Sequence, residues 1–121
     1  MTIVIAEDER IIALSLSMML KRLGHEIRAF CPSGELCVES VERERPDVVF
    51  MDILMDGQMD GIEAAGIVRS RFGTPVIFTT AYDDPATRKR AAALGPMAFL
   101  TKPVSSRMLS RALEGITHRS D

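Results

Sequence analysis

The residues of this chain best suited to catalysis or metal binding are five polar residues, which follow short apolar runs. Glu7 and Asp8 come after the first run, Asp52 after a later one, and Thr80 and Lys102 after two more. Three carboxylates placed together repel one another, and burial raises their pKa values unless a cation neutralises them. All of these ligands are oxygen atoms, so a hard cation such as Mg²⁺ or Mn²⁺ suits them better than zinc.

Beside such a cation, Asp52 could act as the nucleophile of a phosphoryl transfer. A carboxylate can accept a phosphoryl group as an acyl phosphate, while a metal ion and a lysine neutralise charge on the transferring oxygens. Taken singly, each residue has an ordinary explanation: Glu7 and Asp8 could belong to a helix N-terminus, and Lys102 could be a surface lysine. Their joint occurrence at the ends of successive apolar runs favours a shared site.

Five short runs with strand character alternate with longer amphipathic segments along the chain. The run of residues 48–51 is continuously apolar, which is typical of a strand covered on both faces. Each run is too far from the next for a hairpin, so we expect parallel pairing through right-handed helical crossovers. The predicted strands are Thr2 to Ala6, His25 to Phe30, Asp47 to Met51, Val76 to Thr79 and Met97 to Thr101.

Capping residues and prolines mark five helices between and after these strands. The predicted helices run from Asp8 or Glu9 to Gly24, from Ser33 to before Pro46, from about Asp60 to Phe72, from Asp84 to Gly95, and onward from Ser105 or Ser106. The sequence therefore predicts an α/β fold, a doubly wound five-stranded parallel sheet with helices on both faces. Ligands of such sheets bind beyond the carboxyl ends of the strands.

Length and composition limit the possible classes of protein. The 121 residues suit one domain, over residues 1–121, and 46% hydrophobic with 26% charged residues is typical of a globular protein. A net charge of −2 does not favour direct binding to nucleic acid. No run approaches the roughly 20 apolar residues of a membrane span, and the N-terminus lacks a targeting pattern. We therefore expect a cytoplasmic protein without a membrane partner.

Four segments together resemble the receiver domain of two-component response regulators, including the chemotaxis receivers. They read Val4-Ile5-Ala6-Glu7-Asp8, Val49-Phe50-Met51-Asp52, Phe78-Thr79-Thr80-Ala81 and Phe99-Leu100-Thr101-Lys102-Pro103. The resemblance covers essentially the whole chain and implies the strand order 2-1-3-4-5. It also implies that Asp52 is the phosphoacceptor.

The resemblance assigns roles to the residues around Asp52. Glu7, Asp8, Asp52 and the main-chain carbonyl of Leu54 would hold the metal ion. Thr80 and Lys102 would contact the phosphoryl group. In the switch that follows phosphorylation, Thr80 would move toward that group and the ring of Phe99 would change its packing.

The same resemblance implies a signalling module rather than a turnover enzyme. Its phosphodonor would be a histidine kinase or a histidine phosphotransfer protein. Its output would pass to a downstream protein or to an output domain missing from this chain, and a dimer formed on phosphorylation is one form of output. The changed surface would comprise the helix from about Asp84, the last strand and the final helix.

Some residues depart from the family pattern. Glu7 replaces the commoner aspartate, and its longer side chain could bind the metal through water. Asp56 stands where proline is usual, which leaves the shape of the loop after Asp52 open, and Asp56 near the metal is an alternative ligand. The bulky Leu54 and Tyr82 resemble residues that control access of water, which predicts slow dephosphorylation.

Three other functions compete with this interpretation. A haloacid-dehalogenase-like phosphatase would need a second aspartate two residues after the nucleophile, where this chain has Leu54. A flavodoxin-like flavin carrier would need a phosphate-binding loop after the first strand, where the acidic residues 7–9 would repel a phosphate. A degenerate receiver that only docks partners is disfavoured by four intact residues: Asp8, Asp52, Thr80 and Lys102.

Overall fold

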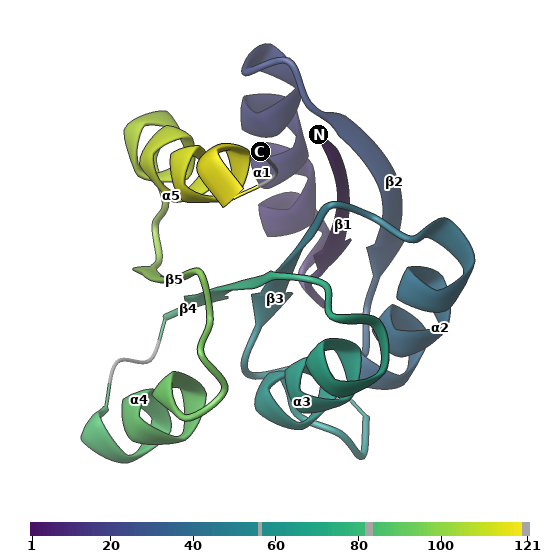
Figure 1. Ribbon diagram of the computed structural model, residues 1–121. Helices are drawn as coiled ribbons and strands as arrows, with labels where there is room; N and C mark the ends of the chain where they lie inside the picture. Colours follow the sequence, from purple (N-terminus) through teal and green to yellow (C-terminus); the bar gives the residue numbers. More distant parts are fainter. Residues whose placement is uncertain (56, 82–83, 120–121) are drawn as a thin grey trace.

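A five-stranded parallel sheet forms the centre of the computed structural model, which describes residues 1–55, 57–81 and 84–119 (Figure 1). The strands are β1 (Thr2–Ala6), β2 (Glu26–Cys31), β3 (Val48–Asp52), β4 (Val76–Thr80) and β5 (Ala98–Thr101). Their order is β2-β1-β3-β4-β5, and every neighbouring pair is parallel. The predicted doubly wound fold and its strand order are therefore confirmed.

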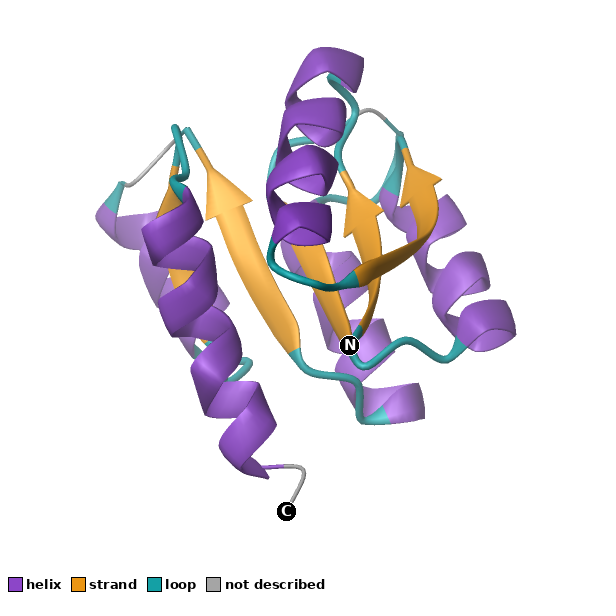
Figure 2. Ribbon diagram, turned by 90° about the horizontal axis from the view of Figure 1, so that it is seen from above, coloured by secondary structure: helices purple, strands orange, loops and turns teal. Residues whose placement is uncertain are grey.

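Two layers of helices cover the sheet (Figures 1 and 2). The helices are α1 (Arg10–Arg22), α2 (Gly34–Glu44), α3 (Gly61–Phe72), α4 (Pro85–Ala92) and α5 (Ser106–Arg119). Apolar residues of α1 and α5 pack with one face of the sheet, and those of α2, α3 and α4 pack with the other. None of the helices in the described part of the chain combines the length and apolar character that crossing a bilayer requires.

The predicted capping residues start four of the helices by accepting main-chain hydrogen bonds. The acceptors and donors are Ser33 from Leu36, Asp60 from Glu63, Asp84 from Thr87 and Ser105 from Met108. The first helix differs, because α1 begins at Arg10 and its N-cap residue, Glu9, makes no side-chain capping bond. The acidic residues before α1 therefore remain available for another role.

Some element ends differ from the prediction. The fourth helix was expected to reach Gly95, but α4 ends at Ala92. The N–H groups of Leu94 and Gly95 bond to carbonyls three residues earlier, so the chain tightens out of the α-helix before Gly95 turns it at a φ of 62°. Leu23, expected on the apolar stripe of α1, follows that helix as its C-cap and is 37% exposed.

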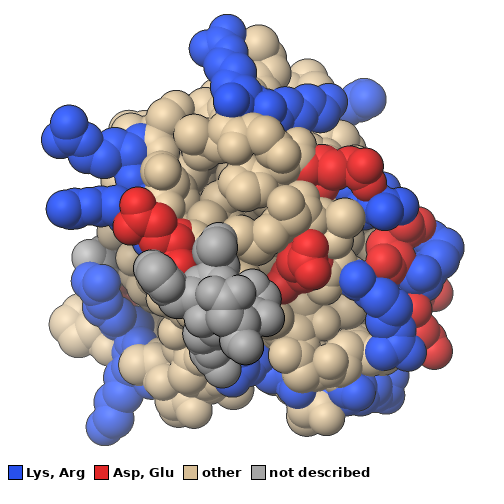
Figure 3. Space-filling model, turned by 45° about the horizontal axis from the view of Figure 1, so that its top comes forward, with Lys and Arg blue, Asp and Glu red and all other residues tan. Residues whose placement is uncertain are grey.

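Burial follows the position of each strand in the sheet. Every residue of β3 and β4 is buried, whereas the outer strands β2 and β5 are partly exposed. On the face seen in Figure 3, most Lys and Arg side chains lie around the rim, and red acidic groups lie next to a largely uncharged centre. Polar side chains at the ends of β3 and β4 therefore sit in a buried setting.

Candidate phosphoacceptor and metal site

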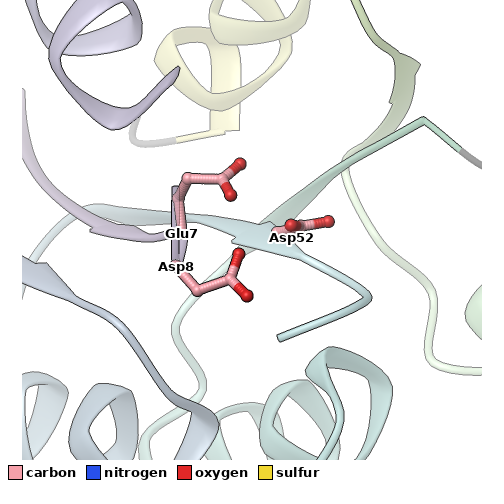
Figure 4. A group of neighbouring side chains, drawn as sticks. All are labelled: Glu7, Asp8 and Asp52. Carbon is pink, nitrogen blue, oxygen red and sulfur yellow. The ribbon is translucent and has the colours of Figure 1, made fainter. Parts of the chain in front are cut away.

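Three carboxylates meet at the carboxyl ends of two neighbouring strands, β1 and β3. Glu7 and Asp8 directly follow β1, and Asp52 is the last residue of β3 (Figure 4). One oxygen from each of the three carboxylates lies within 4.8 Å of the others. The predicted gathering of these residues from distant parts of the sequence is confirmed.

Main-chain hydrogen bonds position Glu7. Its N–H donates to the carbonyl of Cys31 at 2.9 Å, which continues the pairing of β1 with β2 beyond the end of the strand. Its carboxylate accepts a bond of 3.1 Å from the N–H of Glu9, and the residue is only 6% exposed. The Glu7 side chain is therefore held in a buried position at the carboxyl end of β1.

The backbone around Asp52 requires a glycine on the neighbouring helix. The Asp52 carboxylate accepts a 3.3 Å bond from the N–H of Leu54, and the N–H of Gly61 donates to the carbonyl of Ile53 at 2.8 Å. A Cβ at position 61 would lie 2.1 Å from the main-chain oxygen of Asp52. Only glycine permits this approach, which brings the start of α3 against the end of β3.

Lys102 joins two of the carboxylates. Its ammonium lies 3.3 Å from a carboxylate oxygen of Asp52 and also forms an ion pair with Glu7. The contact with Asp52 agrees with the predicted place of Lys102 beside that carboxylate. Its contact with Glu7 was not predicted, because the order of the strands places both residues at one edge of the sheet but does not decide which side chains touch.

The charges in the site are out of balance. The cluster holds three carboxylates, and the Lys102 ammonium contacts two of them, Glu7 and Asp52. Burial raises the pKa of Glu7 to about 7, although bonds from Lys102 and the Glu9 N–H oppose this rise. Burial also raises the pKa of Asp52 against the opposing charge of Lys102. Burial lowers the pKa of Lys102, but its bond to Glu7 and the charge of Asp52 raise that pKa more.

This set of donors fits a hard divalent cation. The three clustered ligands are carboxylates from the β1 and β3 edges, and excess negative charge in a buried setting is relieved when a cation binds. Oxygen-only ligands suit Mg²⁺ or Mn²⁺ rather than a metal that prefers thiolate or imidazole. The Leu54 carbonyl stays a prediction as a fourth ligand. Asp56 and Tyr82 lie outside the described residues.

The two predicted switch residues lie on β4 and β5. Thr80 is fully buried, and its carbonyl accepts a 2.8 Å bond from the N–H of Lys102. It directly follows Thr79, the residue of β4 in register with Asp52. Phe99 is further away, in register with Phe78, and their ring centroids are 6.4 Å apart.

Two contacts made by side chains of α4 were not predicted from the sequence. Arg88 of α4 stacks on Phe99, with its Cζ 4.6 Å from the ring centroid. Arg90, also of α4, forms a 3.1 Å salt bridge with Asp60, the N-cap of α3. Both are arginines on a polar helix, so their type and spacing alone indicate only a solvated face.

Comparisons with known proteins identify the family of the chain. Residues 3–114 match the family model described as the response regulator receiver domain. The chain is 38% identical over 112 residues to the transcriptional regulatory protein PdtaR of Mycobacterium tuberculosis, covering 93% of this chain and 54% of that relative. The chain thus spans about half the length of the curated relative.

Solved structures of similar proteins have the same fold. One is the signal receiver domain of a modulated diguanylate cyclase from Desulfovibrio desulfuricans G20, with 33% identity, a TM-score of 0.92 and coverage of 98% of this chain and 94% of that one. Another is a DNA-binding response regulator of the LuxR family from Staphylococcus aureus, with 26% identity, a TM-score of 0.88 and coverage of 95% and 97%. The chain therefore belongs to the response regulator receiver domains of two-component signalling.

Proposed function

We propose that this receiver domain accepts a phosphoryl group on Asp52 in a reaction that depends on Mg²⁺ or Mn²⁺. The observation that best supports this proposal is the convergence of the three carboxylates, with the Lys102 ammonium 3.3 Å from Asp52. An isolated acidic cluster would suggest cation binding alone. The lysine adds a positive charge where a phosphoryl group on Asp52 would carry its negative oxygens.

In the proposed reaction, a carboxylate oxygen of Asp52 attacks the phosphorus of a phosphohistidine. The new O–P bond forms as the N–P bond breaks, and the bonding electron pair returns to the imidazole nitrogen, which takes up a proton. When bound, the divalent cation supplies charge neutralisation at the phosphoryl oxygens. Glu7, Asp8, Asp52 and the Leu54 carbonyl would hold the cation, while Lys102 and the Thr80 hydroxyl would bind the phosphoryl oxygens.

The proposed switch connects Thr80 to Phe99. Main-chain bonds link the ends of β4 and β5 at Thr80 and Lys102, so a movement of Thr80 toward a phosphoryl group would disturb β5. Phe99 lies on β5 and is only partly buried, which leaves room for its ring to repack. Phosphorylation would bias an existing equilibrium between two arrangements of these residues.

The donor would be a histidine kinase or a histidine phosphotransfer protein. Three apolar residues, Ile11, Leu14 and Met18, form an outer face on α1 and are 82%, 56% and 57% exposed. Ile11 also lines a groove that reaches Lys102 in the proposed site. A protein that brings a phosphohistidine to Asp52 would cover this apolar face, which explains why it is exposed here.

As a receiver, the domain is a signalling module, and its output would pass to a downstream protein or an attached domain. The similar protein from M. tuberculosis is named a transcriptional regulatory protein, and this chain spans 54% of it. We propose that residues 1–121 act as one receiver domain and that α4, β5 and α5 form the surface that changes.

Intact-mass analysis after incubation with a small phosphodonor and Mg²⁺ tests this function. We expect the wild type to gain one phosphoryl mass and the Asp52→Asn variant to gain none. Asp47→Asn is the matched control, because Asp47 lies at the opposite end of β3 and bonds to Thr2. No gain by the wild type would refute phosphorylation, and equal labelling of Asp52→Asn would refute the site.

A further inference from the structure

Among the residues that the structure describes, the ring of Phe99 contacts an aromatic ring of β4 and a cation of α4. Phe78, fully buried on β4, lies on its core side at a centroid distance of 6.4 Å. The Arg88 guanidinium of α4 stacks on the ring from the surface, with 4.6 Å between Cζ and the ring centroid. This distance is within the range of a favourable cation–π contact.

The helix that carries Arg88 is weakly anchored. Of the residues of α4, only Ala91 is buried. A helix with so little buried apolar surface gains little from packing, and its position depends more on individual side-chain contacts. Such contacts include the stack of Arg88 on Phe99 and the 3.1 Å salt bridge between Arg90 and Asp60.

We propose that Arg88 is a positioning residue of the switch, which holds Phe99 and α4 together in the unphosphorylated arrangement. This inference rests on the proposed function, in which Phe99 repacks after phosphorylation. A contact that exists in one arrangement and is lost in the other stabilises the first by its full strength. Removal of the guanidinium therefore favours the arrangement that binds a phosphoryl group.

A titration with beryllofluoride and Mg²⁺ tests the proposal, because beryllofluoride imitates a phosphoryl group on a carboxylate. Binding is followed by calorimetry and by the aromatic NMR signals of Phe99. An exposed cation–π contact corresponds to an increase of about two- to fivefold in apparent affinity in Arg88→Ala. Arg88→Lys keeps a cation without the planar group and should show a smaller increase.

Lys89→Ala is the matched control, since it removes a positive charge and a long side chain from the exposed face of the same helix. Its affinity and its Phe99 signals should equal those of the wild type, whereas the Phe99 signals of metal-free Arg88→Ala should shift toward the beryllofluoride-bound position. Equal or weaker affinity in Arg88→Ala would overturn the role of Arg88 alone. A wild type that does not respond to beryllofluoride would overturn the proposed function, and this inference with it.

Discussion

Replacement of Asp8 with asparagine should stabilise the domain in the absence of metal and weaken its response to Mg²⁺. Lys102 contacts Glu7 and Asp52, whereas Asp8 has no ion pair or hydrogen bond within the described part of the chain. The Asp8 charge therefore contributes repulsion from the other two carboxylates without a compensating bond. Asparagine keeps the size of the side chain and removes that charge.

The expected gain follows from the geometry. Two unit charges at the 4.8 Å limit of the cluster repel by about 3.5 kcal/mol at an effective dielectric constant of 20. Asp8 is partly exposed, so screening by water reduces this to about 1–2 kcal/mol. For a domain of this size, such a gain raises the melting temperature by roughly 4–8 °C.

Thermal unfolding, followed by circular dichroism with EDTA and then with Mg²⁺, measures both effects. In the wild type, Mg²⁺ at ten times its dissociation constant should add about 1.4 kcal/mol. In Asp8→Asn this increment should largely disappear. Asp47→Asn provides the contrast, because it removes the charge of the carboxylate that accepts two bonds from Thr2. The weakened bonds should lower the melting temperature while the Mg²⁺ increment remains. A lower melting temperature of Asp8→Asn than of the wild type in EDTA, or a full Mg²⁺ increment in this variant, would contradict the proposed repulsion at Asp8.

Three further predictions concern the same edge of the sheet. Gly61→Ala should destabilise the domain by at least about 3 kcal/mol in urea unfolding, because its Cβ would lie 2.1 Å from a main-chain oxygen of β3. Gly66→Ala is the control, because its Cβ would have its nearest neighbour at 3.8 Å and should cause no such loss. Similar losses of stability in the two variants would refute the close approach as the cause. The pKa of Glu7 in the folded protein, about 7, exceeds its ordinary value of 4.5. Protonation of Glu7 therefore contributes its full stabilisation of the folded state below pH 4.5, and this contribution is lost as the pH rises through 7. Mg²⁺ competes with this proton, so the affinity for Mg²⁺ measured by calorimetry should rise by at most about tenfold per pH unit up to pH 7. The rise of affinity with pH should be shallower in Glu7→Gln. An identical slope in the variant would exclude Glu7 as the cause. Leu14→Asp should slow phosphotransfer from a phosphohistidine protein at least about tenfold but leave labelling by a small phosphodonor intact. Leu36→Asp, at an exposed leucine of α2, should affect neither reaction. Slowed labelling of Leu14→Asp by the small donor would indicate damage to the site and not a loss of docking.

Much of the fold follows from local sequence patterns. The apolar run 48–51, the caps Ser33, Asp60 and Asp84, and the intervals between the strands determine the elements and their parallel pairing. These patterns act over a few residues and are visible in one dimension. The ends of α1 and α4 were less predictable, because the last turn depends on competing bonds within a few residues of Gly24 and Gly95.

The candidate site shows the same division. The order of acidic, hydroxyl and ammonium residues at strand ends was sufficient to bring Glu7, Asp8, Asp52 and Lys102 to one edge, because parallel strands end on the same side of a sheet. Their residue types also indicated which chemistry to expect. Family resemblance, and not spacing, singled out Phe99.

Only the tertiary structure decided how these groups interact. The pairing of Lys102 with Glu7 as well as Asp52, the close approach of Gly61 to the Asp52 backbone, and the stack of Arg88 on Phe99 all join residues from different elements. Distances across elements depend on how the helices pack on the sheet, which residue type and spacing do not encode. The sequence by itself thus determined which groups share the edge of the sheet, whereas packing determined their contacts, their burial and the raised pKa of Glu7.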